Sequence, residues 1–438
     1  MNKQDLTLLT DLYELTMMQG YYKKGQHETV VFDVFYRHNP CGNGYSVCAG
    51  LDQVIDYIKN LNFTYEDVDY LRSLHIFDDD FLQYLSGFHF TGDIYAIPEG
   101  SVVFPKEPLL KVIAPIMEAQ LVETTILNLI NHQSLIATKT SRVVYAADGD
   151  GIMEFGLRRA QGPDAGLYGA RAAMIGGCVG TSNVLAGQLF DVPVMGTHAH
   201  SWIMTFPDEY TAFKYYAELY PDNCTLLVDT YDTLKSGVPN AIRVFQEFKD
   251  AGKPLKKYGI RLDSGDLAYL SKKARKMLDE AGFPDASICA SNDLDEYLLH
   301  DLKAQGAAIN SWGVGTHLIT SKDCPSFGGV YKLSAIKNEN GEFVPKIKIS
   351  ENTEKITNPG NKTIYRVYEK ETGKIKADLI CFADETFDES QDLLLFDPLE
   401  TWKKTKLAGG TYTMREMLVP IFKNGEHFPF CHGDCRIL

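Results

Sequence analysis

The stretch between residues 224 and 315 carries a short apolar run four times: CTLLVDT at 224–230, YGIRLD at 258–263, ASICAS at 286–291 and INSWGVG at 309–315. A segment with apolar residues at helical spacing separates each run from the next. Such alternation of strand and helix is typical of a parallel sheet with crossover helices. An α/β fold is therefore predicted for this part of the chain.

The same alternation begins upstream, with strands predicted at 151–155 (GIMEF) and 193–196 (PVMG). Six or so units over roughly 170 residues favour an irregular (β/α) barrel over a dinucleotide-binding sheet. No G-x-G-x-x-G opens a strand–helix unit, so the fingerprint of a nicotinamide-cofactor fold is missing.

The segments on either side of the barrel have a different pattern. Residues 93–115 read as short strands interrupted by Pro and Gly, and strands at 330–338 and 362–369 are joined by turn-rich pieces. We expect these flanks to pack together as a split α+β companion domain into which the barrel is inserted. The predicted division is 1–115 for its first part, 116–325 for the barrel and 326–438 for its second part.

The composition argues against several classes of protein. The 438 residues are 45% hydrophobic and 23% charged, which is ordinary for a globular chain, and the formal net charge is −15. An acidic chain repels polyphosphate backbones, which argues against a nucleic-acid partner. The sequence shows no secretory leader and no apolar run of about 18 residues, so we expect a cytoplasmic protein without a membrane span.

The nine cysteines are scattered and form no C-x-x-C pair, a pattern that fits reduced thiols. Cys431 and Cys435 lie close to His432, but two thiols and one imidazole with no second pair nearby do not predict a zinc site.

Polar side chains collect where the predicted strands end. The carboxyl ends of parallel barrel strands meet at one edge, where barrel enzymes place their active sites. Arginine suits a carboxylate or phosphate, aspartate suits ribose hydroxyls or Mg²⁺, and a G-V-G-T turn offers backbone N–H groups to a phosphate. The set therefore points to the handling of anions. Its members include Phe155, Arg158, Ser182, Thr197, His200, Asp229, Arg261, Asp263, Ser291, Gly313, Gly315 and Thr316.

Each member also has a purely structural interpretation. Asp229 or Asp263 alone is as readily explained as a helix cap, and G-V-G-T as a simple turn. His198 and His200 stand two residues apart, and one of them is expected to pack inside. The coincidence of so many polar residues at one end of successive strands favours the functional interpretation.

Seven motifs in order resemble the nicotinate phosphoribosyltransferase family: T-D-L-Y at 10–13, E-F-G-L-R-R at 154–159, G-T-S-N at 180–183, G-T-H-A-H-S at 196–201, L-V-D-T-Y-D at 227–232, R-L-D-S-G-D at 261–266 and G-V-G-T at 313–316. The resemblance runs from near the N-terminus to about residue 370. It implies a type II phosphoribosyltransferase with an irregular barrel and a split companion domain, working as a homodimer with shared sites. The implied reaction joins nicotinate to 5-phosphoribosyl 1-pyrophosphate with coupled ATP hydrolysis, and Mg²⁺ acts through the substrate pyrophosphate.

The resemblance also implies a role for each matched residue. His200 corresponds to a transiently phosphorylated histidine, with Asp229 and Asp263 as acidic residues near it and the ribose. The related enzyme that uses the amide has an aspartate at the position of Ser182, so a hydroxyl there favours the acid. The implied nicotinate contacts are Tyr13 (from the partner subunit), Phe155, Ser182, Thr197 and Arg261, and the implied phosphate contacts are Arg158, Gly313, Gly315 and Thr316.

Two rival interpretations come from other classes. A barrel glycosidase or aldolase would use Asp229 and Asp263 as an acid/base pair, which leaves Arg158, Arg261 and the G-V-G-T turn without a role. A non-catalytic relative of the family would have no reason to keep a full set of strand-end residues.

Overall fold

A computed structural model describes residues 5–253, 255–351, 355–397 and 400–428. The chain forms two compact units. One joins the chain up to Ser134 with the chain from Phe327 onward, and the other comprises Leu135–Ser326. The domain prediction placed its first boundary at residue 115, so the stretch 116–134 groups with the companion unit here; the second boundary, predicted at 325, lies beside the observed one.

The central unit is built on a six-stranded parallel sheet in the order β7-β6-β11-β10-β9-β8. Its strands are β6 (Gly151–Glu154), β7 (Gly180–Thr181), β8 (Cys224–Leu227), β9 (Tyr258–Leu262), β10 (Ser287–Ser291) and β11 (Ser311–Val314). The outermost strands β7 and β8 are not paired with each other, so the sheet is an incomplete barrel. The α/β prediction is confirmed.

Helices follow the strands of this sheet, as the alternation predicted. Their apolar faces bury side chains such as Ala241, Val244 and Leu278 against the sheet side that carries Ile260 and Ile288. They are α7 (Pro163–Ile175), α8 (Val184–Phe190), α9 (His200–Thr205), α10 (Glu209–Leu219), α11 (Val238–Asp250), α12 (Leu267–Glu280), α13 (Glu296–Ala304) and α14 (Thr316–Ile319), with the short turns η2 (Leu157–Arg159) and η3 (Thr233–Gly237).

One predicted strand is wrong. The stretch 193–196 makes only an isolated parallel bridge, from Val194 to Thr181, and no strand. The Thr181 N–H donates to Pro193 O at 3.0 Å and the Met195 N–H donates to Thr181 O at 2.9 Å, but Pro193 has no N–H of its own with which to extend this bridge into a ladder.

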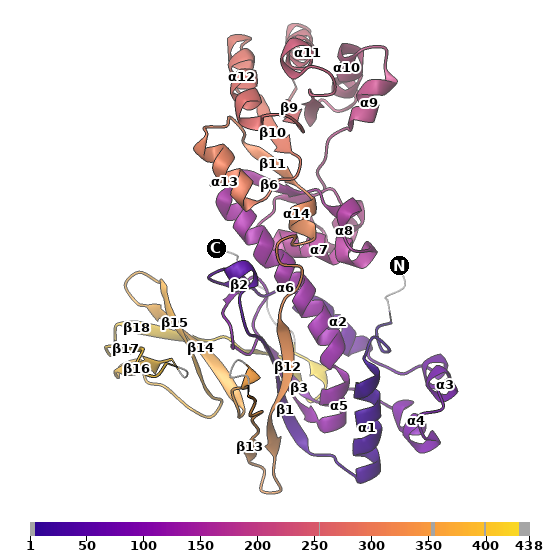
Figure 1. The fold of residues 1–438 in the computed structure, drawn as a ribbon, viewed down its shortest axis with the longest axis vertical. Helices are drawn as coiled ribbons and strands as arrows, with labels where there is room; N and C mark the ends of the chain where they lie inside the picture. The colour runs from indigo at the N-terminus through magenta and orange to yellow at the C-terminus, as the bar shows by residue number, and fades with distance from the viewer. Residues whose placement is uncertain (1–4, 254, 352–354, 398–399, 429–438) are drawn as a thin grey trace. The chain divides into compact units, whose positions relative to one another are not determined.

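The companion unit contains a seven-stranded antiparallel sheet in the order β13-β12-β1-β5-β3-β19-β20. Strand β1 (Thr29–Tyr36) lies between β5 (Leu110–Pro115) and β12 (Gly329–Lys337), a strand from the other end of the chain. Figure 1 shows this as indigo β1 beside orange β12. The remaining strands are β13 (Phe343–Pro345), β3 (Asp93–Ala96), β19 (Val419–Lys423) and β20 (Glu426–His427).

Smaller sheets and helices complete this unit. A three-stranded sheet has the order β15-β14-β18, and two further pairs are β16-β17 and β2-β4. The strands are β14 (Lys362–Glu369), β15 (Ile375–Phe382), β18 (Tyr412–Glu416), β16 (Leu393–Phe396), β17 (Lys404–Leu407), β2 (Ser46–Val47) and β4 (Val102–Val103). The helices are α1 (Leu12–Lys24), α2 (Leu51–Asn60), α3 (Tyr65–Ser73), α4 (Asp79–Leu85) and α5 (Ile116–Leu121), with the turn η1 (Pro40–Gly42). Helix α6 (Glu123–Ala146) contains the division between the units.

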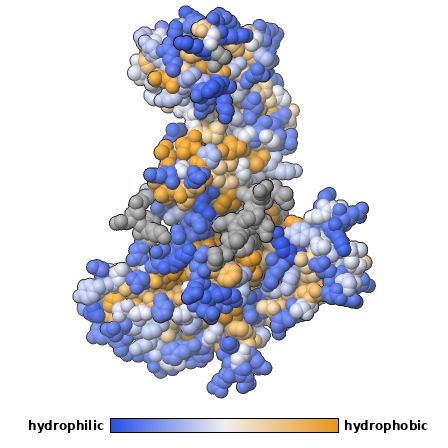
Figure 2. All heavy atoms as spheres, turned by 180° about the vertical axis from the view of Figure 1, so that it is seen from behind, coloured by the Kyte–Doolittle hydropathy of each residue, from blue (hydrophilic) through white to orange (hydrophobic). Residues whose placement is uncertain are grey.

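The surface seen in Figure 2 is mostly hydrophilic, with smaller hydrophobic areas among the charged side chains. Across the described ranges, no helix combines the length and the apolar character needed to span a bilayer. Cys431, Cys435 and His432, the residues weighed as zinc ligands, lie outside the described part of the chain.

Candidate active site

The strand register brings the predicted residues to one edge of the parallel sheet. Arg261 of β9 lies opposite Cys289 of β10, and Ser291 at the end of β10 lies opposite Gly313 of β11. Gly313 in turn lies opposite Met153 of β6. Because side chains alternate along a strand, Arg261, Ser291 and Gly313 share the sheet face turned away from the covering helices.

Arg261 is held on this face by three hydrogen bonds. Its Nε donates to Ser291 Oγ at 2.8 Å, Nη1 donates to Thr197 Oγ1 at 2.8 Å, and Nη2 donates to Asp263 Oδ1 at 2.7 Å. Ser291 Oγ also donates to Asp263 Oδ1 through a very short hydrogen bond. The guanidinium is therefore fixed in direction, and two of its five N–H groups are left for an incoming anion.

Asp263 connects this arginine to His200. The Asp263 Oδ2 atom lies 3.6 Å from His200 Nε2, and His200 Nδ1 lies 3.0 Å from Thr230 Oγ1. Burial raises the pKa of Asp263, but the hydrogen bond from Ser291 and the charge of Arg261 outweigh burial and hold that pKa below its ordinary value. A carboxylate anion is therefore kept beside the half-exposed imidazole of His200.

His198 has the opposite surroundings. It is only 8% exposed, its ring packs edge-on against Tyr216, and its Nε2 accepts the backbone N–H of Leu227 at 3.3 Å. Burial lowers the pKa of His198 to about 4. The expectation that one of the two histidines packs inside is confirmed, and it is His198. His200 is the one that faces the polar edge.

Asp229 adds a second carboxylate at the same edge. Its Oδ2 accepts the backbone N–H of Asp263 at 2.8 Å and the hydroxyl of Ser264 at 2.6 Å. Its Oδ1 is buried and has no hydrogen-bond partner among the residues that the structure describes. Asp229 thus holds the chain after β9 in place, and one of its carboxylate oxygens has no hydrogen-bond partner in the described part of the chain.

Phe155 and the 313–316 turn form a single packed element. The Phe155 N–H donates to Val314 O at 2.8 Å, and a Cβ atom on Gly313 would lie 2.5 Å from Phe155 Cδ2. A Cβ on Gly315 would lie 3.2 Å from Phe155 O. Glycine at 313 therefore leaves the space that the aromatic ring occupies, and Thr316 follows at the start of α14.

Buried Glu154 supports the adjoining segments. Its carboxylate accepts the Thr181 hydroxyl at 2.6 Å and, through a very short bond, the backbone N–H of Gly156. Its backbone carbonyl accepts the N–H of Ser182 at 3.0 Å. Burial raises the pKa of Glu154, and the side chain is fully enclosed. Glu154 therefore fixes the backbone on either side of Phe155 and before Ser182.

Two predicted residues are not part of this hydrogen-bonded group. Arg158 lies in the exposed turn η2, after β6. Tyr13 belongs to the companion unit, near the start of α1, and its side chain is 45% exposed.

Ser291 is among the strand-end polar residues of the sequence but received no predicted role, and Thr230 and Glu154 were not predicted as site residues. Ser291 had a visible signal, since it ends a predicted strand. Thr230 follows Asp229 directly, and Glu154 is an acidic residue inside an apolar run, a position that calls for internal hydrogen bonds.

A cavity of about 350 Å³ occupies the hollow face of the same sheet. Its wall includes Met153, Met195, Thr197 and Cys289, and lysines 256 and 257 line it near the amino ends of the strands. The cavity therefore reaches the layer of Thr197, the hydroxyl that accepts from Arg261.

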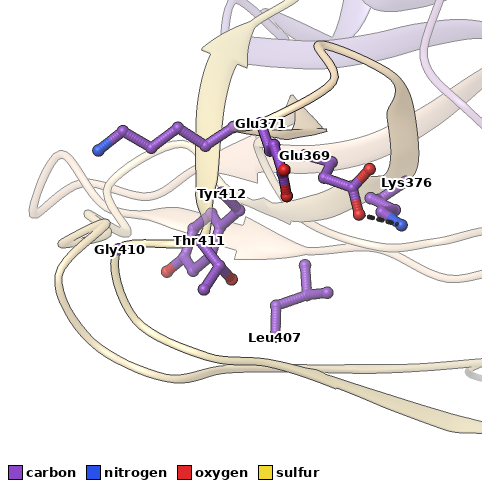
Figure 3. Close-up of a pocket in the computed structure, with 8 residues that line it drawn as sticks. Glu369, Glu371, Lys376, Leu407, Gly410, Thr411 and Tyr412 are labelled. Carbon is purple, nitrogen blue, oxygen red and sulfur yellow. Dashed lines mark ion pairs between the residues drawn. The ribbon is translucent and has the colours of Figure 1, made fainter.

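A second cavity, of about 410 Å³, lies in the companion unit among β14, β15 and β18 (Figure 3). Charged side chains line it, including the Lys376–Glu369 ion pair at 2.7 Å. None of the predicted site residues is among its lining residues, which are Glu369, Lys370, Glu371, Lys376, Leu407, Gly410, Thr411 and Tyr412.

Three family models match the chain in succession. The nicotinate phosphoribosyltransferase (NAPRTase) N-terminal domain matches residues 8–131, the nicotinate phosphoribosyltransferase (NAPRTase) family matches residues 151–372, and the nicotinate phosphoribosyltransferase C-terminal domain matches residues 361–430. The chain belongs to the nicotinate phosphoribosyltransferase family. The resemblance found in the sequence is thereby confirmed, and the match to the C-terminal domain extends it beyond residue 370.

Individual members of the nicotinate phosphoribosyltransferase family are similar along most of their length. The nicotinate phosphoribosyltransferase of Bacillus subtilis (strain 168) is 52% identical over 398 residues, which cover 91% of this chain and 80% of that protein. The Homo sapiens nicotinate phosphoribosyltransferase is 33% identical over 450 residues, with 89% and 82% covered.

Solved structures agree with the fold. The crystal structure of human nicotinic acid phosphoribosyltransferase superposes with a TM-score of 0.82 at 29% identity, covering 95% of this chain and 90% of that one. The nicotinate-nucleotide pyrophosphorylase from Pyrococcus furiosus shares the fold, with a TM-score of 0.73 at 22% identity over 98% and 93% of the two chains.

Proposed function

We propose that the chain transfers a phosphoribosyl group from 5-phosphoribosyl 1-pyrophosphate to nicotinate, giving nicotinate mononucleotide and pyrophosphate with coupled hydrolysis of ATP. The observation that carries the proposal is the fixed guanidinium of Arg261, held between Thr197, Ser291 and Asp263 at the strand ends. Family membership supports it, because the relatives bear the name of this activity.

The acid substrate is matched by one cation and one aromatic ring. The two remaining N–H groups of Arg261 suit a carboxylate, and Thr197 lies beside them. Phe155 offers a flat face for a pyridine ring, while Tyr13 of the partner subunit covers the opposite face in the proposed homodimer. The Ser182 hydroxyl is able to donate to a carboxylate, which favours nicotinate over its amide.

The sugar substrate is assigned to the 313–316 turn and to Arg158. In the reaction the C1–oxygen bond breaks, its electron pair leaves with pyrophosphate, and the lone pair of the pyridine nitrogen forms the new C1–nitrogen bond. Positive charge develops on the ribose during this exchange, and the carboxylates of Asp229 and Asp263 stabilise it electrostatically.

The residues present fit a magnesium ion carried by the substrate. Asp229 keeps one carboxylate oxygen without a hydrogen-bond partner in the described structure, and few carboxylates plus substrate oxygens are the ligand set that Mg²⁺ prefers. Asp229 and Asp263 would hold the ion, which supplies charge neutralisation on the pyrophosphate when bound. Across the described residues, no group of three or more His, Cys, Asp and Glu side chains is arranged to hold a metal by itself.

His200 is assigned as the phosphoryl acceptor. With its Nδ1 proton donated to Thr230, the lone pair of Nε2 is free to attack the terminal phosphorus of ATP; a nitrogen–phosphorus bond forms and the bond to the ADP oxygen breaks. Water then releases phosphate from the imidazole. The negative charge that phosphorylation adds to His200 lies beside Asp263. This charge links ATP hydrolysis to the substrate pocket. The enzyme would serve NAD biosynthesis from nicotinate, a salvage reaction, in the cytoplasm.

The test uses the purified full-length protein with nicotinate, 5-phosphoribosyl 1-pyrophosphate, ATP and Mg²⁺. We expect nicotinate mononucleotide, pyrophosphate, ADP and phosphate as products, and a loss of ATP hydrolysis of about 100-fold or more in His200→Ala. His300→Ala, which removes an exposed histidine on α13 in the same unit, is the matched control. Absence of the mononucleotide would refute the transferase proposal, and undiminished ATP hydrolysis in His200→Ala would refute the role of His200.

A further inference from the structure

The hydroxyl of Ser291 stands between the two charged residues of the candidate active site. Ser291 is the last residue of β10 and is 3% exposed. It accepts from Arg261 Nε at 2.8 Å and donates to Asp263 Oδ1, while Arg261 Nη2 donates to the same oxygen at 2.7 Å. These bonds close a ring of three side chains: Arg261 from β9, Asp263 directly after β9, and Ser291 from β10.

The direction of each bond in the ring is fixed. A serine hydroxyl carries one proton, and a carboxylate accepts only, so the proton goes to Asp263 and a lone pair receives Arg261. The ring leaves Asp263 Oδ2 facing His200 at 3.6 Å and leaves Arg261 Nη1 on Thr197 at 2.8 Å. Neither charged side chain is able to turn without breaking a bond to Ser291.

The two ends of this ring have different proposed partners. Arg261 and Thr197 are assigned to nicotinate, whereas Asp263 faces the histidine assigned to the phosphoryl group. A change of charge on His200 acts first on Asp263 Oδ2, and the rigid ring carries any rotation of that carboxylate to the guanidinium.

We propose that Ser291 is a positioning residue that couples the nicotinate pocket to His200 by holding Arg261 and Asp263 in one rigid hydrogen-bonded ring. The proposal rests on the proposed function. The residue touches neither substrate nor reacting atoms, so its removal is expected to separate ATP hydrolysis from product formation rather than to abolish either.

The experiment compares Ser291→Ala with Ser287→Ala in the full-length enzyme. Ser287 lies four residues earlier on the same face of β10, and its hydroxyl donates to the Tyr258 carbonyl at 3.2 Å, outside the ring. For Ser291→Ala we expect a KM for nicotinate raised about tenfold, since Arg261 loses one charged hydrogen bond, and more than one ATP hydrolysed per mononucleotide formed. Ser287→Ala should keep the wild-type KM and ratio.

Ser291→Thr keeps the hydroxyl and should restore the ratio of ATP hydrolysed to product toward the wild-type value. The proposal is overturned if Ser291→Ala keeps both the KM and the ratio of the wild type, or if its losses match those of Ser287→Ala at an equal fall in melting temperature. A wild-type enzyme that forms no mononucleotide would instead defeat the proposed function.

Discussion

Two histidines that stand two residues apart in the chain have opposite environments. His198 lies against Tyr216 and accepts the Leu227 N–H, whereas His200 lies beside Asp263 and Thr230. His200 is the first residue of α9, whereas His198 lies in the segment that precedes this helix, so the two side chains leave the backbone from different local structures. Which one is enclosed depends on partners that come later in the chain, from Tyr216 to Asp263, so the sequence led to the expectation of one enclosed histidine but not to which of the two it is.

The buried imidazole makes the stability of the protein sensitive to acid. The folded state holds His198 neutral with a pKa of about 4, while the unfolded chain binds a proton near pH 6.5. The neutral, buried imidazole of His198 therefore makes its full contribution to the free energy of unfolding above pH 6.5. This contribution is lost as the pH falls from 6.5 toward 4. At pH 5 the loss should be about 2 kcal/mol.

Urea unfolding of the wild type and His198→Gln at pH 7.5 and pH 5.0 measures this effect. The stability advantage of the wild type over the variant should shrink by that amount between the two pH values. A parallel comparison with His300→Gln, an exposed position, should show no such change. An advantage that is the same at both pH values would contradict the assignment of His198 as a buried neutral base.

At the scale of the elements, the strand–helix alternation from residue 151 to 315 was predictable because each run has enough apolar residues to form a buried strand. The 193–196 stretch is an exception, since Pro193 lacks the N–H that would extend the bridge at Val194 into a ladder. The Phe155–Gly313 contact between two strands that are far apart in sequence was not predictable from either strand alone.

This contact gives an element-scale prediction. In Gly313→Ala the new Cβ would lie 2.5 Å from the Phe155 ring, which must turn aside. We expect a KM for nicotinate raised at least tenfold and a stability loss of about 1–3 kcal/mol. Gly151→Ala, at the start of β6, places its Cβ 3.4 Å from Val179 and is the control. Steady-state kinetics measure the KM for nicotinate, and thermal unfolding measures the loss of stability. A wild-type KM in Gly313→Ala would show that Phe155 does not line the nicotinate pocket.

At the scale of the whole molecule, the companion unit depends on contacts between the two ends of the chain. Its composition and turn pattern predicted a split domain, but not which strands pair. The partner of β1 is β12, and the buried Lys362 of β14 donates to Asp33 Oδ2 of β1 at 2.7 Å. A buried charge pair of this kind cannot be predicted from one segment, because Asp33 and Lys362 lie far apart in the sequence and each is buried only in the presence of the other.

Breaking that pair should destabilise the companion unit. The side chains of Lys362 and Asp33 are 6% and 4% exposed, so Lys362→Met leaves a buried carboxylate without its main counter-charge and should cost about 3–5 kcal/mol. The double variant Asp33→Asn with Lys362→Met removes both charges and should recover part of the loss. Chemical unfolding of the wild type, both single variants and the double variant tests this, and equal losses in the single and double variants would contradict it.

The interleaved pairing of β1 with β12 has a consequence for synthesis on the ribosome. All six strands of the parallel sheet have been synthesised once residue 314 has been added, whereas one edge of β1 has no partner until Gly329–Lys337 follow, and one edge of β3 has none until Val419–Lys423. The central parallel sheet thus has all its strands before the antiparallel sheet that contains β1 does. During that interval the nascent protein carries open strand edges, which are the surfaces that invite aggregation and that chaperones protect.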